Sequence, residues 1–191
     1  PPFSFSCKTE IHFGVDAHCK LIELLPKNAQ SILFVKGVSN GASSPVRLLL
    51  SNAGHRCETV VCRGEPSIRS VNDIWQTVKE QPVDCVVVCG GGSAIDTGKA
   101  VRVALHKGAP LTDDDFAINH MRTGNIPLIV LPTTAGTGSE ATANAVLGAA
   151  SQNAKISLRG QGLLPSIAIV DPALMRGAPR PVVLQAGLDA V

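Results

Sequence analysis

The sequence predicts an α/β fold in which a mostly parallel, Rossmann-like sheet is flanked by helices. Short apolar runs bounded by glycine or proline recur along the chain, as is typical of strands buried inside a parallel sheet. Segments with apolar residues at helical spacing separate these runs, so strands alternate with helices as in β-α-β units. With 191 residues, 45% of them hydrophobic, the chain can bury a sizeable core, and we identify no internal repeat or low-complexity linker.

The N-terminal part is expected to lead into the first buried strand. Residues 1–19 favour a short edge strand or hairpin, because apolar side chains such as Phe3 and Phe5 alternate with polar ones. A short helix is expected over Leu21–Leu25, followed by a compact strand over Ile32–Val35.

The next elements repeat the alternation of helix and strand. Proline is favoured in the first turn of a helix, so Pro45 is expected to begin a helix that ends near Gly54. Thr59–Cys62 predicts a second strand, and the apolar spacing over Ser67–Glu80 predicts the helix after it. Val83–Cys89 is a nearly continuous apolar run and predicts a central strand.

A glycine-rich turn follows this central strand. Gly90, Gly91 and Gly92 precede a predicted helix over Ser93–His106, and Ser93 with Asp96 has the spacing of a capping box. Glycines between a buried strand and a helix N-terminus let the backbone approach an anion, and the helix dipole favours its charge. We therefore expect a phosphate cradle here, although such turns also occur without ligands.

Two familiar phosphate-binding patterns do not fit this turn. The dinucleotide fingerprint requires a third glycine where Ile95 stands, and the P-loop requires a glycine at Ser93 and a hydroxyl at Ala100. Lys99 is expected on the solvent-side stripe of the helix with Arg102.

A second loop rich in hydroxyl groups follows the predicted strand Leu128–Leu131. Thr133, Thr134 and Thr137 are suited to sugar and phosphate oxygens. The alternative is a tight loop that caps a helix starting near Glu140. A serine nucleophile is disfavoured, because the G-x-S-x-G frame is absent. The remaining predicted elements are a hairpin of Ala145–Leu147 with Lys155–Leu158, a strand over Ile167–Val170 and a helix beginning at Pro181.

Composition excludes several classes of function. The net charge of +2 is small and its positive residues are scattered, and aromatic residues are 3% with no tyrosine, which argues against nucleic-acid binding. No signal pattern or membrane-length apolar run is present, so we expect no membrane association. The six cysteines form no C-x-x-C pair, which favours free thiols in a reducing, cytoplasmic compartment. Cys85 and Cys89 are expected to pack as small core residues.

The two loops together resemble the iron-containing (group III) alcohol dehydrogenase family. The resemblance is carried by Gly90–Ser93 with Asp96 and Lys99, by Pro132–Glu140, and by Asp171–Met175 and Gly187–Ala190 in the same order and at similar spacing. It spans about Ile32 to Val191. We call Pro132–Glu140 the threonine loop. Other families share the fold or are relatives, namely dehydroquinate synthases, glycerol dehydrogenases and maleylacetate reductases, but their counterparts of this loop differ. The resemblance implies a dehydroquinate synthase-like N-terminal domain over residues 1–180, and a truncated helical metal-binding domain beginning at 181–191.

The resemblance also implies a cofactor site. NAD or NADP would place its pyrophosphate on Gly91, Gly92 and Ser93, with Asp96 nearby, Thr133, Thr134 and Thr137 along the cofactor, and Lys155 at the nicotinamide end. Relatives that prefer NAD hold the ribose hydroxyls with an aspartate where this chain has Gly37. No carboxylate there would repel a 2′-phosphate, and Lys36 and Ser39 could favour it, so we favour NADP.

The family's reaction is hydride transfer between a small alcohol or aldehyde and the nicotinamide, assisted by Fe(II) or Zn held by one aspartate and three histidines. Asp189 matches the aspartate, whereas the five histidines match none of the ligand positions and are expected to be structural or exposed. The chain stops two residues later, so we expect the helical C-terminal domain to be absent and this chain alone to be inactive, with no catalytic residue of its own. Relatives commonly form homodimers. The alternatives are a non-catalytic nucleotide-binding module, or a hydrolase or transferase acting on another phosphate ligand.

Overall fold

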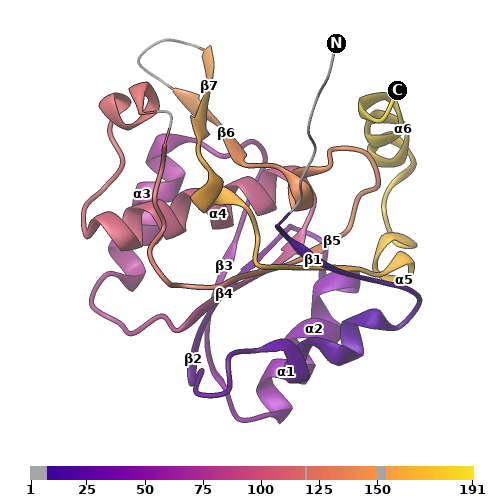
Figure 1. Ribbon diagram of the computed structural model, residues 1–191. Helices are drawn as coiled ribbons and strands as arrows, with labels where there is room; N and C mark the ends of the chain where they lie inside the picture. The colour runs from indigo at the N-terminus through magenta and orange to yellow at the C-terminus, as the bar shows by residue number, and fades with distance from the viewer. Residues whose placement is uncertain (1–7, 119, 150–153) are drawn as a thin grey trace.

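The protein, in a computed structural model that describes residues 8–118, 120–149 and 154–191, is an α/β fold as predicted (Figure 1). Its main sheet has six strands in the order β1-β8-β5-β4-β2-β3, and all neighbouring pairs are parallel. The carboxyl ends of the strands therefore meet at one edge of the sheet. The strands are β1 (Glu10–Phe13), β2 (Ser31–Lys36), β3 (Arg56–Val61), β4 (Cys85–Gly90), β5 (Leu128–Pro132) and β8 (Ile167–Val170).

Helices cover both faces of this sheet (Figure 1). One face packs against α1 (Leu21–Leu24), α2 (Asn40–Asn52) and α5 (Pro172–Met175), and the other packs against α3 (Ile68–Val78) and α4 (Gly92–Lys107). The last helix is α6 (Arg180–Asp189). The 3-10 turns are η1 (Ala17–Lys20), η2 (Asp113–Ala117), η3 (Ser139–Ala141) and η4 (Gln161–Leu163).

Strand β4 lies at the centre of the core. All six of its residues are buried, and successive side chains point to opposite faces of the sheet. Val86 and Val88 join the cluster under α3 and α4, whereas Cys85 and Cys89 join the cluster under α2. Burial raises the pKa of both thiols to about 12, which confirms that these cysteines behave as core residues. Among the described residues the cysteines are free, and Cys7 lies outside that part of the chain.

The predicted hairpin forms a second, two-stranded sheet. Strands β6 (Asn144–Ala149) and β7 (Ala154–Arg159) pair antiparallel, and β6 packs against α4. The prediction of a solvent-facing Lys99 with Arg102 is therefore wrong, because the start of the hairpin covers Lys99, and Thr123 and Leu164 accept hydrogen bonds from Arg102. Lys99 is fully buried and Arg102 is only 4% exposed.

Two predicted helix starts differ from the structure. Helix α2 begins at Asn40, directly after the extended Ser39, so Pro45 lies inside the helix rather than at its start. Helix α4 begins one residue early, at Gly92, and the predicted capping box is absent, because Asp96 accepts a hydrogen bond from the Val146 N–H instead.

Two further expectations are settled by the described residues. Of the edge strand or hairpin expected over residues 1–19, the described part supplies an edge strand, β1, which pairs parallel with β8, while Phe3 and Phe5 lie outside the described residues. The helix expected near Glu140 is only the short turn η3. Within the described ranges, no helix combines the length and apolar character needed to cross a bilayer.

Candidate functional site

The order of the strands reverses between β2 and β4. From β2 the chain passes through α2 to β3, and then through α3 on the opposite face back to β4 on the other side of β2. Helices leave β2 and β4 toward opposite faces, so a crevice opens outside the carboxyl ends of these two strands. Gly37 follows β2 at this point, and its N–H donates to the Cys89 carbonyl of β4.

The glycine turn forms the floor of this crevice. Gly91 is the N-cap of α4, and the N–H groups in the first turn of a helix have no carbonyl partner within the helix. The sixteen-residue helix directs its positive dipole end to the same point. A Cβ atom on Gly91 would lie 3.2 Å from Oγ1 of Thr134, and one on Gly92 would lie 3.1 Å from Cγ2 of Thr137. Glycine at both positions therefore lets the two loops approach each other without displacing Thr134 or Thr137.

The threonine loop forms one wall. Thr133 N–H donates to the Gly90 carbonyl over 3.0 Å, which ties the end of β5 to the end of β4. Thr134 Oγ1 is buried without a hydrogen-bond partner, one of two such side-chain atoms in the described part of the chain. A buried hydroxyl without a partner is costly, so this atom is suited to a ligand that would bond to it.

The crevice contains two adjoining hollows. The first has a volume of about 420 Å³, a size suited to a small ligand. Eight of the ten predicted cofactor residues line it, namely Gly37, Ser39, Gly91, Gly92, Ser93, Thr133, Thr134 and Thr137.

The second hollow has a volume of about 400 Å³ and continues the crevice toward the β6–β7 hairpin. It contains the two remaining predicted residues, Asp96 and Lys155, and shares Gly92, Ser93 and Thr137 with the first. Lys155 is well exposed, and its Nζ forms an ion pair with Glu65 at 2.9 Å. All ten predicted residues thus line one continuous crevice.

Lys36 does not reach this crevice. It is 7% exposed and hydrogen-bonded to Asn40 of α2, on the sheet face opposite α4. The expectation that Lys36 contributes to a 2′-phosphate site is therefore wrong, whereas Ser39 does line the first hollow.

Asp189 lies at the end of α6 and lines both hollows. No histidine of the described chain lines either hollow with it. The carboxylates of Glu65 and Asp96 line the second hollow with it, but among the described residues these three do not come close enough together to share one ion, as the group Asp16, His18 and Asp171 does. The described residues at the crevice therefore do not by themselves fit a metal ion.

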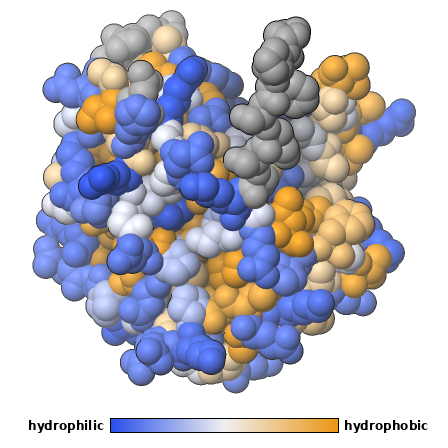
Figure 2. All heavy atoms as spheres, viewed as in Figure 1, coloured by the Kyte–Doolittle hydropathy of each residue, from blue (hydrophilic) through white to orange (hydrophobic). Residues whose placement is uncertain are grey.

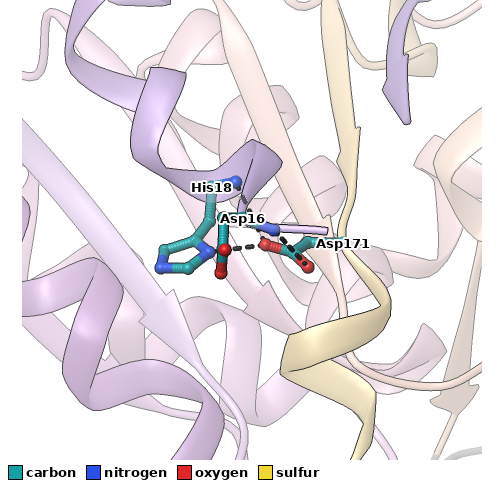
Figure 3. Close-up of side chains that lie close together, drawn as sticks. All are labelled: Asp16, His18 and Asp171. Carbon is teal, nitrogen blue, oxygen red and sulfur yellow. Dashed lines mark hydrogen bonds and ion pairs between the residues drawn. The ribbon is translucent and has the colours of Figure 1, made fainter. Parts of the chain in front are cut away.

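Asp16, His18 and Asp171 form a cluster of potential metal ligands away from the crevice (Figure 3). The fully buried Asp171 accepts hydrogen bonds from His18 Nδ1 at 2.5 Å and from the N–H groups of Asp16, His18 and Ala173. Burial raises the pKa of Asp171, but these hydrogen bonds outweigh it and hold the pKa below its ordinary value. The donors already occupy the carboxylate, so the cluster is a clip that ties η1 to the start of α5.

Sequence reasoning missed part of the site. Glu65 lines both hollows and holds Lys155, and it follows β3 at the same edge of the sheet, so its position after a strand was the available signal. The loop between α5 and α6 adds a wall through Gly177 and Pro179, and no local motif indicates that wall.

Comparison with known proteins gives a consistent family match. The chain matches the family described as iron-containing alcohol dehydrogenase over residues 8–172. It is 32% identical over 127 residues to the NAD-dependent methanol dehydrogenase of Bacillus methanolicus, covering 66% of this chain and 33% of that relative.

Solved structures agree with this match. The iron-containing alcohol dehydrogenase of Thermococcus thioreducens superposes with a TM-score of 0.83 at 29% identity, covering 97% of this chain and 51% of that one. The sulfoacetaldehyde reductase of Bifidobacterium kashiwanohense, solved in complex with NAD+, superposes with a TM-score of 0.86 at 26% identity, covering 99% and 51%. The chain thus spans about a third of the length of the curated relative and about half of these solved chains.

Proposed function

Because the chain belongs to the iron-containing alcohol dehydrogenase family, we propose that its crevice binds NAD or NADP for an alcohol or aldehyde oxidoreductase. When bound, the nicotinamide would supply the carbon that accepts or donates the hydride. The relatives' names support binding of such a cofactor, since one relative is an NAD-dependent methanol dehydrogenase and another was solved with NAD+.

The observation that carries the proposal is the unpartnered Thr134 hydroxyl beside the glycine turn. It is buried at the N-terminus of α4, where free N–H groups and the helix dipole favour an anion. A pyrophosphate placed on Gly91, Gly92 and Ser93 would accept from those N–H groups and from the hydroxyl together. The residues present therefore fit the cofactor.

The two hollows suggest how a dinucleotide would lie. Its adenosine half would occupy the first hollow beside Gly37 and Ser39, and its nicotinamide half would extend into the second beside Asp96 and Lys155. Thr133 and Thr137 would line the middle. In this arrangement Lys155 exchanges its ion pair with Glu65 for the nicotinamide end of the cofactor.

We infer a preference for NADP over NAD from Gly37 and Ser39. Gly37 offers no carboxylate to bond the ribose hydroxyls or to repel a 2′-phosphate, and Ser39 offers a hydroxyl at the same place. Lys36 lends no support, because it is buried on the other side of the strand.

Fe(II) or Zn²⁺ dependence is proposed for the whole enzyme only. Asp189 is the one ligand of the predicted set that the described crevice provides, and the remaining ligands would be histidines outside these residues. We derive no step through a metal held by this chain. The alternative function is therefore a nucleotide-binding module without catalysis, which would bind NADPH but hold no metal.

The proposal also covers the domain boundaries, the oligomeric state and the cellular compartment. Residues 1–180 would be the cofactor domain and 181–191 the start of a helical one. This is consistent with α6, which exposes the apolar side chains of Val183, Leu184 and Leu188. Hydrophobic surface gathers over this helix at the upper right of Figure 2. The edge strand β1 exposes Ile11 and Phe13, which suits a homodimer contact. The free cysteines suit the cytoplasm.

Titration of the chain with NADPH and with NADH, followed by nicotinamide fluorescence, tests the proposal. We expect saturable binding of both, with the tighter dissociation constant for NADPH. If neither cofactor binds at millimolar concentration, the hypothesis that the chain is part of a dehydrogenase is refuted. If NADH binds more tightly than NADPH, only the proposed preference for NADP is refuted.

A further inference from the structure

Lys99 has an unusual environment for a lysine. Its side chain is fully buried on α4, and its Nζ donates to the carbonyls of Thr142 and Asn144 at 3.0 and 2.8 Å and to Thr142 Oγ1 at 3.1 Å. An ammonium group has three hydrogens and no acceptor, so these three oxygens match its whole donor capacity.

Asp96, one turn earlier on the same helix, binds the same segment. Its Oδ2 accepts from the Val146 N–H at 3.0 Å, and its Oδ1 lies 3.8 Å from the ammonium of Lys99. Two charged side chains of α4 thus hold Thr142, Asn144 and Val146 in succession.

This segment sets the geometry of the second hollow. Thr142, Asn144 and Val146 line it directly, and β6 carries β7, in which Lys155 pairs with Gly148. Lys99 does not itself line the hollow but lies beneath it. Any cofactor contact with this wall therefore depends on the position that Lys99 and Asp96 give to the strand.

Stability alone does not account for a charge at this position. Desolvating an ammonium is expensive, and an apolar side chain of similar volume is often as stabilising. Burial lowers the pKa of Lys99 to about 8, although Asp96 and Glu140 act in the opposite direction. What the ammonium adds, and an apolar residue would not, is three directed hydrogen bonds to the segment that enters β6, two of them to Thr142 and one to Asn144.

We propose that Lys99 is a positioning residue for the nicotinamide half of the cofactor site. With Asp96 it fixes the segment 142–146, so the adenosine and pyrophosphate contacts in the first hollow are independent of it. This inference rests on the proposed function.

The test compares a dinucleotide with its truncated form. Dissociation constants are measured for NADPH and for 2′-phospho-ADP-ribose, which keeps every group except the nicotinamide. In Lys99→Met we expect NADPH to bind about tenfold more weakly and the fragment to bind within twofold of its original affinity. Lys99→Arg, which keeps a buried cation, should restore most of the NADPH affinity.

Arg102→Met is the matched control. Arg102 is a buried cation one turn further along α4, and it donates to Thr123 and to the Leu164 carbonyl, neither of which lines the crevice. We expect this variant to leave the ratio of the two dissociation constants unchanged.

A pH profile of the unmutated chain decides the matter if Lys99→Met does not fold. The charged groups facing Lys99 are Asp96 and Arg102 from α4 and Glu140 from η3. We expect the affinity advantage of NADPH over the fragment to fall several-fold between pH 7 and pH 9.5, and to remain constant in Lys99→Arg.

The outcomes separate the two proposals. Failure of the unmutated chain to bind either ligand refutes the proposed function. If both ligands bind the unmutated chain, two results would overturn the positioning role. One is that Lys99→Met loses the same factor of affinity for NADPH and for the fragment. The other is that the affinity advantage of NADPH over the fragment stays the same in Lys99→Met and across the pH range.

Discussion

Gly91 and Thr134 meet where the two loops of the crevice touch. A side chain at position 91 would push into Thr134 and would stand between the α4 N-terminus and a pyrophosphate. We predict that Gly91→Val weakens NADPH binding at least tenfold, about 1.4 kcal/mol, because the backbone could no longer approach the anion.

Gly187→Val is the control for this substitution, because a Cβ at position 187 meets nothing within 4 Å. Isothermal titration calorimetry of both variants gives the comparison. Equal affinity of Gly91→Val and the unmutated chain would refute the placement of the pyrophosphate.

The buried Lys99 also leads us to predict how the free energy of unfolding changes with pH. The ordinary pKa of 10.5 applies to the unfolded chain, and the folded value is about 8. Between these values the unfolded chain binds more protons, so the contribution of Lys99 to the free energy of unfolding rises with pH, by up to about 3 kcal/mol.

The measurement is urea unfolding of the unmutated chain and of Lys99→Met at pH 7 and pH 10. Cysteines and other groups titrate in both proteins, so only the difference between them reports Lys99. Relative to Lys99→Met, the unmutated chain should gain stability on going to pH 10, and a relative loss would contradict the lowered pKa.

Site residues differed in how far the sequence revealed them. Gly91, Ser93 and Thr134 directly follow apolar runs, and the carboxyl ends of parallel strands form ligand sites, so local sequence sufficed to predict their place. Lys99 was misjudged because the hairpin that covers it lies more than forty residues away in the chain. Helical spacing identifies a stripe of side chains but not what packs over it.

At the scale of elements, the Asp171 carboxylate joins η1 to α5. The carboxylate accepts a hydrogen bond from His18 and caps α5 by accepting from the Ala173 N–H. An asparagine at this position would turn one of the two acceptor oxygens into an NH₂ group, which cannot accept a hydrogen bond from these donors. We predict that Asp171→Asn lowers the free energy of unfolding by about 2 kcal/mol at pH 7.

The pH dependence of this effect has a definite sign. The folded pKa of Asp171 lies below its ordinary value of 3.8, so its stabilisation is present above about pH 4 and is lost as the pH falls through the folded value. Thermal unfolding from pH 7 to pH 2 should show the two proteins converging, and a constant gap would contradict the clip.

Helix α6 is held against the threonine loop at Gly136. A Cβ atom at this position would overlap the carbonyl oxygen of Ala186. We predict that Gly136→Ala displaces α6, and with it Asp189, from the crevice. Amide exchange within residues 180–189 should rise at least tenfold, whereas Gly177→Ala, whose Cβ meets nothing within 4 Å, should leave it unchanged. Unchanged exchange in Gly136→Ala would show that α6 does not depend on this contact.

The strands were predicted more accurately than the helix starts. Runs such as Ile32–Val35 and Leu128–Leu131 identify strands because burial on both faces requires uninterrupted apolar residues. The start of α2 was missed because proline is favoured in the first turn of a helix, whereas Pro45 is the sixth residue of α2, where its ring removes a hydrogen bond within the helix. Helix α4 starts within one residue of its prediction, but Asp96 serves β6 instead of capping it.

At the scale of the whole molecule, the order of strands determines the site. The sequence predicts a parallel sheet, but not that β4 returns beside β2 and opens a crevice there. Because that order depends on packing between distant segments, the single continuous crevice could not be derived from spacing. The family resemblance supplied what local patterns did not, and the match over residues 8–172 confirms it.

The crevice also predicts the metal content of this 191-residue chain. Of the predicted ligand set the described residues supply only Asp189, and the carboxylates at the crevice form no group close enough to share an ion, so we expect less than about 0.1 Fe or Zn per chain and no aldehyde reduction, together with intact NADPH binding. Elemental analysis after purification with added Fe(II) tests this. Stoichiometric metal would refute the view that ligands beyond these residues are needed.

The central claim is that the glycine turn of α4 holds the pyrophosphate of a nicotinamide cofactor. A crystal structure of the chain with NADPH tests it most directly. We expect pyrophosphate oxygens about 3 Å from the N–H groups of Gly92 and Ser93, and a nicotinamide directed toward Asp96 and Lys155. NADPH bound outside the crevice, or bound in the reverse direction, would contradict it.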